Sequence, residues 1–193
     1  MKILGIYGSP RKDGNTDLML NAFLEGAAGE GAEIERLYVR DLAMSGCLEC
    51  GQCDETGICA VKDDMVSVYP MLEKAGNIVV ATPIFFYGVT GQLKLMIDRS
   101  QASYMAKALA VRDGGKKPPG PPRRGVLLSA GATRGKRLFE CAALTIKYFF
   151  DALDVVYSGD LCFRQIEGKG AVRLHPTALE ECFKAGRDFV LHA

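Results

Sequence analysis

The chain has few of the residues and patterns that mark several common classes of protein. It contains only two histidines and no Gly-x-Ser-x-Gly segment, so a hydrolase with a Ser-His-acid triad is not expected. No apolar run approaches the roughly 18 residues that cross a bilayer, and Lys2 leads directly into an apolar segment rather than a signal peptide. A net charge of +1 gives no general attraction to nucleic acid or anionic lipid. We therefore expect a cytoplasmic protein that binds neither membranes nor nucleic acid.

What is present indicates an α/β protein. Short apolar runs alternate with helical patterns, which is typical of a parallel sheet built from βαβ units. The 193 residues are expected to form a single domain, with no internal repeat. Five strands with intervening helices match the flavodoxin-like three-layer sandwich, whose five-stranded parallel sheet has the order 2-1-3-4-5. The predicted strands are residues 3–7, 33–39, 78–82, 125–128 and about 155–161, of which the charged 33–39 is placed at the edge.

Two helix predictions concern the second half of the chain. A long helix is expected from about Lys136 to Leu153. The last helix is expected to follow His175 and Pro176, with the proline in its first turn and the histidine as a cap.

The loop after the first strand has the composition of a phosphate site. Gly8 and Gly14 let the backbone approach an anion, and the segment between them ends where a helix begins. The loop is neither Gly-x-Gly-x-x-Gly nor Gly-x4-Gly-Lys-Ser/Thr, so it favours a single phosphate monoester such as that of FMN. An ordinary βα turn, rich in Gly and Asn, is the alternative.

Two further loops are expected at the same edge of the sheet. Residues 82–91 are apolar and aromatic although they lie where the chain meets solvent, so they should cover a flat apolar ring or a neighbouring subunit. Residues 129–135 are small and Gly-rich, which suits close approach to a planar ring but also a plain turn.

Taken together, these segments resemble the NADPH-dependent FMN reductase family. The resemblance depends on residues 8–11 with 15–16, on residues 83–88 and on residues 93–99, and it extends from residue 1 to about 160. It implies a phosphate site and a ring site for FMN. The residues implied for the phosphate are Ser9, Arg11, Asn15 and Thr16; those implied for the ring are Pro83, Ile84, Phe85, Phe86, Tyr87 and Gly88, with Ser129, Gly131 and Thr133 opposite.

Four of the seven cysteines form a cluster in a loop of residues 46–60. Cys47, Cys50, Cys53 and Cys59 have the spacing Cys-x2-Cys-x2-Cys-x5-Cys, which suits a [4Fe–4S] cluster better than the two separated pairs of a zinc site. The same cluster makes the chain resemble the iron–sulfur flavoproteins within the family. Free or oxidised thiols and zinc are the alternatives.

The other cysteines and one basic segment carry weaker signals. Cys141, Cys162 and Cys182 are expected in the core, and the odd cysteine count argues against a disulfide framework. An insertion at about 107–124 contains prolines, and five of its basic residues form a stretch for which we expect a solvated arm, a subunit contact or a site for the 2′-phosphate of NADPH. These five residues are Arg112, Lys116, Lys117, Arg123 and Arg124.

The resemblance implies an FMN-dependent oxidoreductase in which the flavin carries the chemistry, so no catalytic side chain is predicted. Its donor would be NAD(P)H, its partners small-molecule or protein electron donors and acceptors, and its assembly a homodimer or homotetramer. One alternative is a cluster-free NAD(P)H:FMN, quinone or azo reductase. A flavodoxin-type electron carrier is another, although the net charge of +1 lacks the acidity of such carriers. A redox-sensing thiol protein would leave the flavin loops unexplained.

Overall fold

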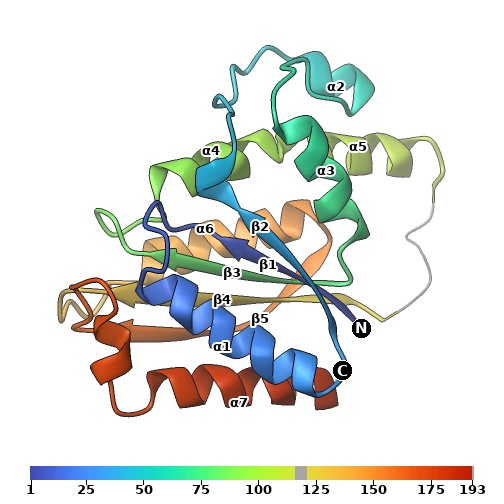
Figure 1. Cartoon of the computed structure of the whole chain (residues 1–193). Coiled ribbons are helices and arrows are strands. Elements are labelled where there is room, and N and C mark those ends of the chain that lie inside the picture. Colours follow the sequence, from blue (N-terminus) through green and yellow to red (C-terminus); the bar gives the residue numbers. More distant parts are fainter. Residues whose placement is uncertain (116–120, 193) are drawn as a thin grey trace.

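The computed structural model describes residues 1–115 and 121–192, and it is built around one parallel sheet (Figure 1). The five strands lie in the order β2-β1-β3-β4-β5, and each neighbouring pair is parallel. The expected flavodoxin-like order is therefore confirmed. The strands are β1 (Lys2–Tyr7), β2 (Glu33–Tyr38), β3 (Asn77–Pro83), β4 (Arg123–Gly131) and β5 (Val155–Arg164).

Helices cover both faces of the sheet and so complete the three layers (Figure 1). On one face, α1 (Asn15–Gly29) and α7 (Ala178–Leu191) lie side by side over an apolar core. On the other face, α3 (Met65–Lys74), α4 (Gly91–Arg99) and α6 (Glu140–Ala152) enclose a second core. The shorter or more peripheral elements are η1 (Val39–Asp41), α2 (Gln52–Thr56), α5 (Gln101–Arg112) and η2 (Ala171–Leu174).

The burial of each strand follows its place in the sheet. Residues 3–7 of β1 and 77–82 of β3 are buried on both faces, which explains their continuous apolar sequence. β2 pairs only with β1 and carries exposed charged residues, as predicted for an edge strand. None of the helices in the described ranges is long and apolar enough to span a membrane.

Two glycines allow α1 and α7 to pack closely. A Cβ atom on Gly26 would lie 2.1 Å from the carbonyl oxygen of Phe183, and one on Gly186 would lie 1.9 Å from that of Phe23. Any side chain at either position would push the helices apart. The close contact holds the C-terminal helix against α1, the helix that begins at the predicted phosphate loop.

Several element boundaries differ from the predicted ones. β4 continues to Gly131 and β5 to Arg164, because these ends pair with each other in register. α6 begins at Glu140 rather than near Lys136, since residues 135–139 form hydrogen-bonded turns. Pro176 precedes α7 instead of lying in its first turn.

The histidine cap of α7 is confirmed. Nδ1 of His175 accepts a hydrogen bond from the backbone N–H of Ala178 at 3.1 Å and a longer one from that of Thr177 at 3.3 Å. Because of these hydrogen bonds, the His175 side chain has a structural role at the start of α7.

The insertion at 107–124 is partly regular. α5 occupies it up to Arg112 and β4 begins at Arg123, while Lys116 and Lys117 lie outside the described residues. Arg123 donates hydrogen bonds to the carbonyl oxygens of Leu72 and Leu153. Arg124 donates to those of Phe189 and His192. Both arginines lie at the amino end of β4, where their guanidinium groups are bonded to backbone carbonyl oxygens.

The three isolated cysteines differ in their surroundings. Cys182 is buried as predicted and Cys162 is half-buried, but Cys141 is exposed. α6 directs Ala142, Ile146 and Phe149 inward, so Cys141 lies on the opposite face. The prediction of a core position for Cys141 is wrong.

Candidate functional site

The loops after β1, β3 and β4 meet at the carboxyl edge of the sheet, where hydrogen bonds join them. The backbone N–H of Gly8 donates to the Ala81 carbonyl oxygen at 2.8 Å, and that of Ile84 donates to the Ala130 carbonyl oxygen at 3.0 Å. The buried Thr90 hydroxyl donates to the Gly8 carbonyl oxygen at 2.5 Å. Thr90 thus ties the first loop to the second, a role that no sequence motif indicated.

The first loop is shaped to receive an anion at the start of α1. Gly14 precedes the helix, and the first intrahelical bond is donated by Leu18, so the N–H groups of residues 15–17 have no partner within the helix. The Thr16 hydroxyl is buried and has no hydrogen-bond partner among the described residues. A Cβ atom on Gly14 would lie 3.0 Å from the Arg11 carbonyl oxygen, a tight contact that glycine avoids. Unpaired donors around a glycine cradle fit a phosphate group.

Ser9 and Arg11 have different places in this loop. The Ser9 side chain is buried, and its Oγ accepts a hydrogen bond from the Arg11 N–H at 3.1 Å. This turn shapes the loop. The Arg11 side chain is exposed, and its guanidinium is accessible to a ligand.

The Asn15 side chain, predicted at the phosphate, bonds to the segment that follows β5. Its Nδ2 donates to the Gly168 carbonyl oxygen at 2.8 Å, and its Oδ1 accepts from the Val172 N–H at 3.1 Å. Both ends of the amide are therefore engaged with the segment that follows β5. The side chain holds this segment against the loop, while the backbone N–H of Asn15 remains one of the unpaired donors of the first turn.

A buried ion pair beneath the loop was missed by the sequence analysis. Arg40 Nη1 lies 2.9 Å from Asp17 Oδ2 and donates to the Ser9 carbonyl oxygen at 3.2 Å. Asp17 Oδ2 also accepts from the Asp13 N–H. Burial raises the pKa of Asp17, although Arg40 acts in the opposite direction. Arg40 follows β2, far from the loop in sequence, so no local pattern could have identified the pair.

The second loop is a strained aromatic hairpin. Phe85 and Gly88 exchange two backbone hydrogen bonds, of 3.0 and 2.9 Å, around Phe86 and Tyr87. These two residues have φ angles of +47° and +64°, the left-handed region that side-chain-bearing residues rarely adopt. Such strain persists mainly at functional sites and costs about 1–3 kcal/mol per residue.

The aromatic side chains of the hairpin are available to a ligand. Phe86 is fully exposed and Phe85 and Tyr87 are about half exposed. A Cβ atom on Gly135 would lie 2.6 Å from the Tyr87 hydroxyl, so the hairpin and the third loop face each other. The half-buried Pro83, Ile84 and Gly88 form the base of the hairpin.

The third loop is shorter than predicted because β4 is longer. Ser129 is fully buried in β4, and its hydroxyl donates to the Thr82 carbonyl oxygen at 2.8 Å. It belongs to the sheet, so its predicted contact with the ring is wrong. Gly131 ends the strand, and its carbonyl oxygen accepts from the Ile166 N–H. Of the three predicted residues, only Thr133 lies exposed in the loop.

A fourth segment, residues 165–170, also reaches this edge. With the Gln165 amide oriented to accept, its oxygen lies 2.9 Å from both Nε and Nη2 of Arg134. Together with the Asn15 contacts, this bond places the segment beside the first and third loops. The sequence analysis missed it because β5 was predicted to end near residue 161.

The cysteine loop is a separate region, with its four thiols free. Cys47 and Cys50 are exposed, whereas Cys53 and Cys59 are half-buried. Burial raises the pKa of Cys53, and the nearby Asp54, Cys59 and Cys47 add to the effect. Thiolates are soft donors that suit iron–sulfur and zinc centres. Within the described residues, however, no three Cys, His, Asp or Glu side chains converge on a single metal-ion position.

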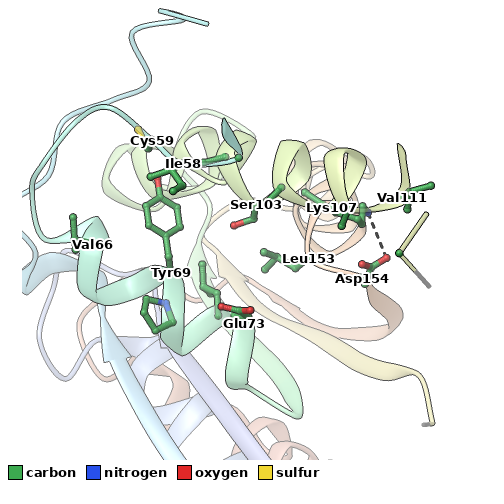
Figure 2. Close-up of a pocket in the computed structure, with 18 of the residues that line it drawn as sticks. Ile58, Cys59, Val66, Tyr69, Glu73, Ser103, Lys107, Val111, Leu153 and Asp154 are labelled. Atoms are coloured by element: carbon green, nitrogen blue, oxygen red, sulfur yellow. Dashed lines mark hydrogen bonds and ion pairs between the residues drawn. The ribbon is translucent and has the colours of Figure 1, made fainter. Parts of the chain in front are cut away.

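Beside the cysteine loop lies a cavity of about 660 Å³, shown in Figure 2. It is enclosed by α3, α5 and the turn before β5. None of its lining residues comes from the loops after β1, β3 and β4. Its walls are mainly apolar, with Cys59 at one side and the Lys107–Asp154 ion pair of 3.4 Å at the other. The volume is that of a small-molecule site. Its wall includes Ile58, Val66, Tyr69, Val111 and Leu153.

Comparison with known proteins gives relatives of two kinds. An iron–sulfur flavoprotein of Methanocaldococcus jannaschii is 36% identical over 151 residues, which cover 78% of this chain and 71% of that protein. A putative NAD(P)H-dependent FMN-containing oxidoreductase of Bacillus subtilis is 32% identical over 99 residues, 51% of each chain. In other archaeal iron–sulfur flavoproteins the match spans about half to two-thirds of the relative, from 45% in one of Archaeoglobus fulgidus to 65% in a second one of M. jannaschii.

Solved structures agree in fold. An NAD(P)H:quinone oxidoreductase from Methanothermobacter marburgensis superposes with a TM-score of 0.73 at 15% identity, covering 98% of this chain and 96% of that one. A flavone reductase gives a TM-score of 0.70 at 20% identity, covering 99% of this chain and 62% of that one. The family model of NADPH-dependent FMN reductase matches residues 1–137, which include the first two loops and the cysteine loop. The chain belongs to the NADPH-dependent FMN reductase family.

Proposed function

We propose that the protein is an FMN-dependent oxidoreductase that takes electrons from NAD(P)H and passes them to a second acceptor. The observation that carries this proposal is the cradle at the start of α1. The Thr16 hydroxyl has no hydrogen-bond partner among the described residues, and the N–H groups of residues 15–17 have none within the helix. A terminal phosphate satisfies these donors, and the exposed Arg11 can fork onto its oxygens.

The remaining loops would bind the flavin ring. The Phe85–Gly88 hairpin offers aromatic faces, and its strained turn fixes their direction before the ring arrives. Tyr87 and the turn at Gly135 would enclose the ring from the side of β4. When bound, FMN supplies hydride and single-electron transfer. The residues of this chain bind and orient the flavin, and we assign none of them as an acid or base.

A [4Fe–4S] cluster on Cys47, Cys50, Cys53 and Cys59 is the second part of the proposal. Four free thiols in one glycine-containing loop fit the donor set of such a cluster. The iron–sulfur flavoproteins among the relatives support the assignment. The cluster would exchange single electrons with the flavin. A cluster-free reductase is the competing function, favoured by the absence of a converged metal site among the described residues.

The test uses protein loaded with FMN and kept anaerobic. NADPH or NADH should bleach the visible absorbance of the bound flavin, and iron and sulfide analysis of the reconstituted protein should separate the two forms. A bound flavin that dithionite reduces but neither nucleotide does would contradict the NAD(P)H-linked activity. Reconstituted protein without iron would favour the cluster-free reductase.

A further inference from the structure

Arg99, the last residue of α4, has an environment that ordinary packing does not explain. It is the largest of the fully buried side chains in the described part of the protein, and its side chain has no exposed surface. A buried guanidinium is stable only when its charge and its N–H groups are matched. Its partners therefore show which part of the molecule it holds.

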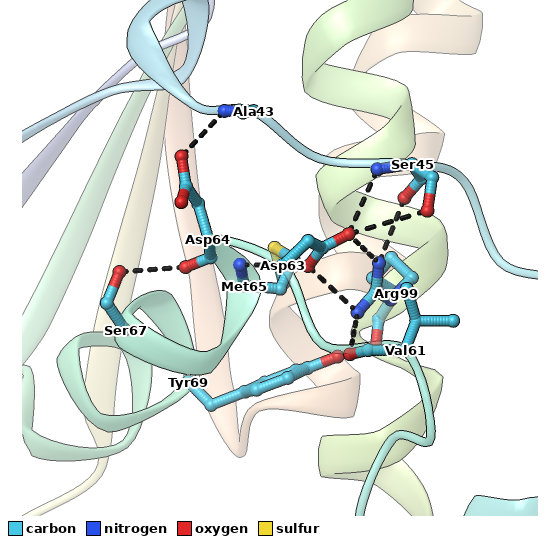
Figure 3. Close-up of polar contacts among 9 residues, drawn as sticks. All are labelled: Ala43, Ser45, Val61, Asp63, Asp64, Met65, Ser67, Tyr69 and Arg99. Carbon is cyan, nitrogen blue, oxygen red and sulfur yellow. Dashed lines mark hydrogen bonds and ion pairs between the residues drawn. The ribbon is translucent and has the colours of Figure 1, made fainter.

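The partners lie at the two ends of the cysteine loop (Figure 3). Arg99 Nη1 donates to the Ser45 carbonyl oxygen at 3.0 Å, and Nη2 donates to the Val61 carbonyl oxygen at 3.1 Å. The same two nitrogens contact Oδ2 and Oδ1 of Asp63 at 2.7 and 3.2 Å. Asp63 in turn accepts from the Ser45 N–H at 3.0 Å. One guanidinium thus joins the residues just before Cys47 and just after Cys59.

The loop between these two ends has few other supports. Residues 47–52 are exposed, and α2 is a single turn of five residues. Its main support is Gly57, where a Cβ atom would lie 2.7 Å from Cα of Ala106 in α5. Closing the base removes conformations that would separate the first cysteine from the last, because a loop with fixed ends has fewer shapes.

Cys59 is the cysteine next to this base. Nearby, the Tyr69 hydroxyl donates to the Arg99 carbonyl oxygen at 3.1 Å. One N–H of the guanidinium, at Nε, is buried with no partner among the described residues. The arginine therefore has both charge and a spare donor beside the cysteine loop.

We propose that Arg99 and Asp63 are positioning residues for metal ligation. They hold the two ends of the cysteine loop together before a cluster binds, and Arg99 places a positive charge at the base of the loop. This inference rests on the proposed cluster. An iron–sulfur centre with four thiolates is anionic, and its reduction potential depends on nearby charge and hydrogen bonds.

The first test measures hydrogen exchange in FMN-loaded, metal-free protein. Arg99→Met and Asp63→Asn should speed amide exchange in residues 45–61 at least tenfold, because the base of the loop opens. Lys94→Met, which removes an exposed 2.7 Å ion pair with Asp98 on the same helix, is the matched control and should leave exchange unchanged. Wild-type exchange rates in residues 45–61 of Arg99→Met would overturn the positioning role. Arg99→Lys, a milder change, serves if Arg99→Met does not fold.

The second test reconstitutes the same variants anaerobically with ferrous iron and sulfide. Arg99→Met should bind less than a quarter of the wild-type iron, and its residual cluster should have a more negative reduction potential because a positive charge is lost. Arg99→Lys keeps the charge, so the reduction potential of its cluster should lie close to the wild-type value. If Arg99 acted only by holding the loop, keeping the charge would not bring the potential back. Full iron content with the wild-type potential in Arg99→Met would overturn the inference.

The two tests separate this inference from the proposed function. A wild-type protein that takes up no iron would refute the cluster and the charge role of Arg99 together. The exchange measurement needs no metal, so it decides independently whether Arg99 and Asp63 close the loop.

Discussion

At the scale of single residues, Arg40 and Arg99 support two loops in the same way. Arg40 binds Asp17 and a carbonyl oxygen of the loop after β1, and Arg99 binds Asp63 and two carbonyl oxygens at the base of the cysteine loop. The Arg99 guanidinium lowers the pKa of Asp63 to about 2, so this carboxylate is ionised at any ordinary pH. Each pair anchors a polar loop that has little apolar surface of its own to bury.

Arg11 gives the first prediction at this scale. Arg11→Ala should weaken FMN binding by about 1.5–3 kcal/mol, because it removes a charge-assisted hydrogen bond to phosphate. Lys184→Ala, an exposed cation on α7, is the control. Fluorescence titration of apoprotein with FMN measures both. An unchanged dissociation constant in Arg11→Ala would show that the arginine does not touch the phosphate.

The second prediction at this scale concerns the cysteines of the cysteine loop. Replacing any one of Cys47, Cys50, Cys53 and Cys59 by Ala should remove most iron and sulfide from the reconstituted protein, because a cluster that lacks one thiolate is labile. FMN binding should survive, since its donors lie on other loops. The exposed Cys141 is the natural control and should retain full iron when changed to Ala. Equal iron loss in the Cys141 variant would refute the assignment of ligands.

At the scale of secondary-structure elements, the hairpin after β3 combines strain with exposure. Phe86 has a left-handed backbone and a fully exposed side chain. If this position had been selected only for stability, glycine or asparagine would be expected there. The aromatic residue is therefore best explained by a ligand that covers it.

This reading predicts opposite effects on stability and binding. Phe86→Gly relieves about 1–2 kcal/mol of left-handed strain and costs about 0.5–1 kcal/mol of backbone entropy. The apoprotein should thus become slightly more stable, while FMN affinity falls by about 0.5–1.5 kcal/mol through the lost ring contact. Phe86→Leu keeps the strain and removes the ring, so it should lose affinity without gaining stability. Thermal unfolding and FMN titration distinguish the two variants, and unaltered FMN affinity in both would contradict the role of the ring.

The sequence predicted the elements better than it predicted their ends and their polar contacts. Alternating apolar runs and helical patterns sufficed for the five strands and their order. The last residues of β4 and β5 were missed because they are strands through pairing with neighbouring strands: Ser129 pairs with both Thr82 of β3 and Cys162 of β5. This pairing also moved the Ser129 hydroxyl from the predicted site into the sheet.

In the predicted site, too, the sequence located the loops but not the polar contacts between them. Glycines and exposed aromatics mark a binding loop locally, so the first two loops could be located from sequence. The partners that shape them could not, because Arg40 and Asp17 lie on different elements, as do Asn15 and Gly168. Nor does a local pattern show that Arg99 reaches both ends of the cysteine loop.

At the scale of the whole molecule, the exposed apolar side chains include two groups on different elements. One is the Phe85–Tyr87 hairpin, and the other is the outer face of α6, where Leu144 and Tyr148 are exposed. A flavin bound at the proposed site would cover part of the first and none of the second. Exposed apolar patches of this kind are typical of subunit interfaces.

We therefore expect self-association. Sedimentation of the FMN-loaded protein at micromolar concentration should show a dimer or tetramer rather than the 20.9 kDa chain. Tyr148→Lys should shift the distribution toward smaller species, because a buried unpaired charge opposes an apolar interface. A single 20.9 kDa species for the wild type would contradict this expectation.

The central claim is that the start of α1 binds the phosphate of FMN, and a comparison of flavins tests it most directly. Apoprotein is titrated separately with FMN and with riboflavin, which has the same ring and no phosphate. The account predicts that FMN binds at least tenfold more tightly, a difference of about 1.4 kcal/mol or more. Equal affinity for FMN and riboflavin would contradict it, because the unpaired donors around Thr16 would then have no part in binding the flavin.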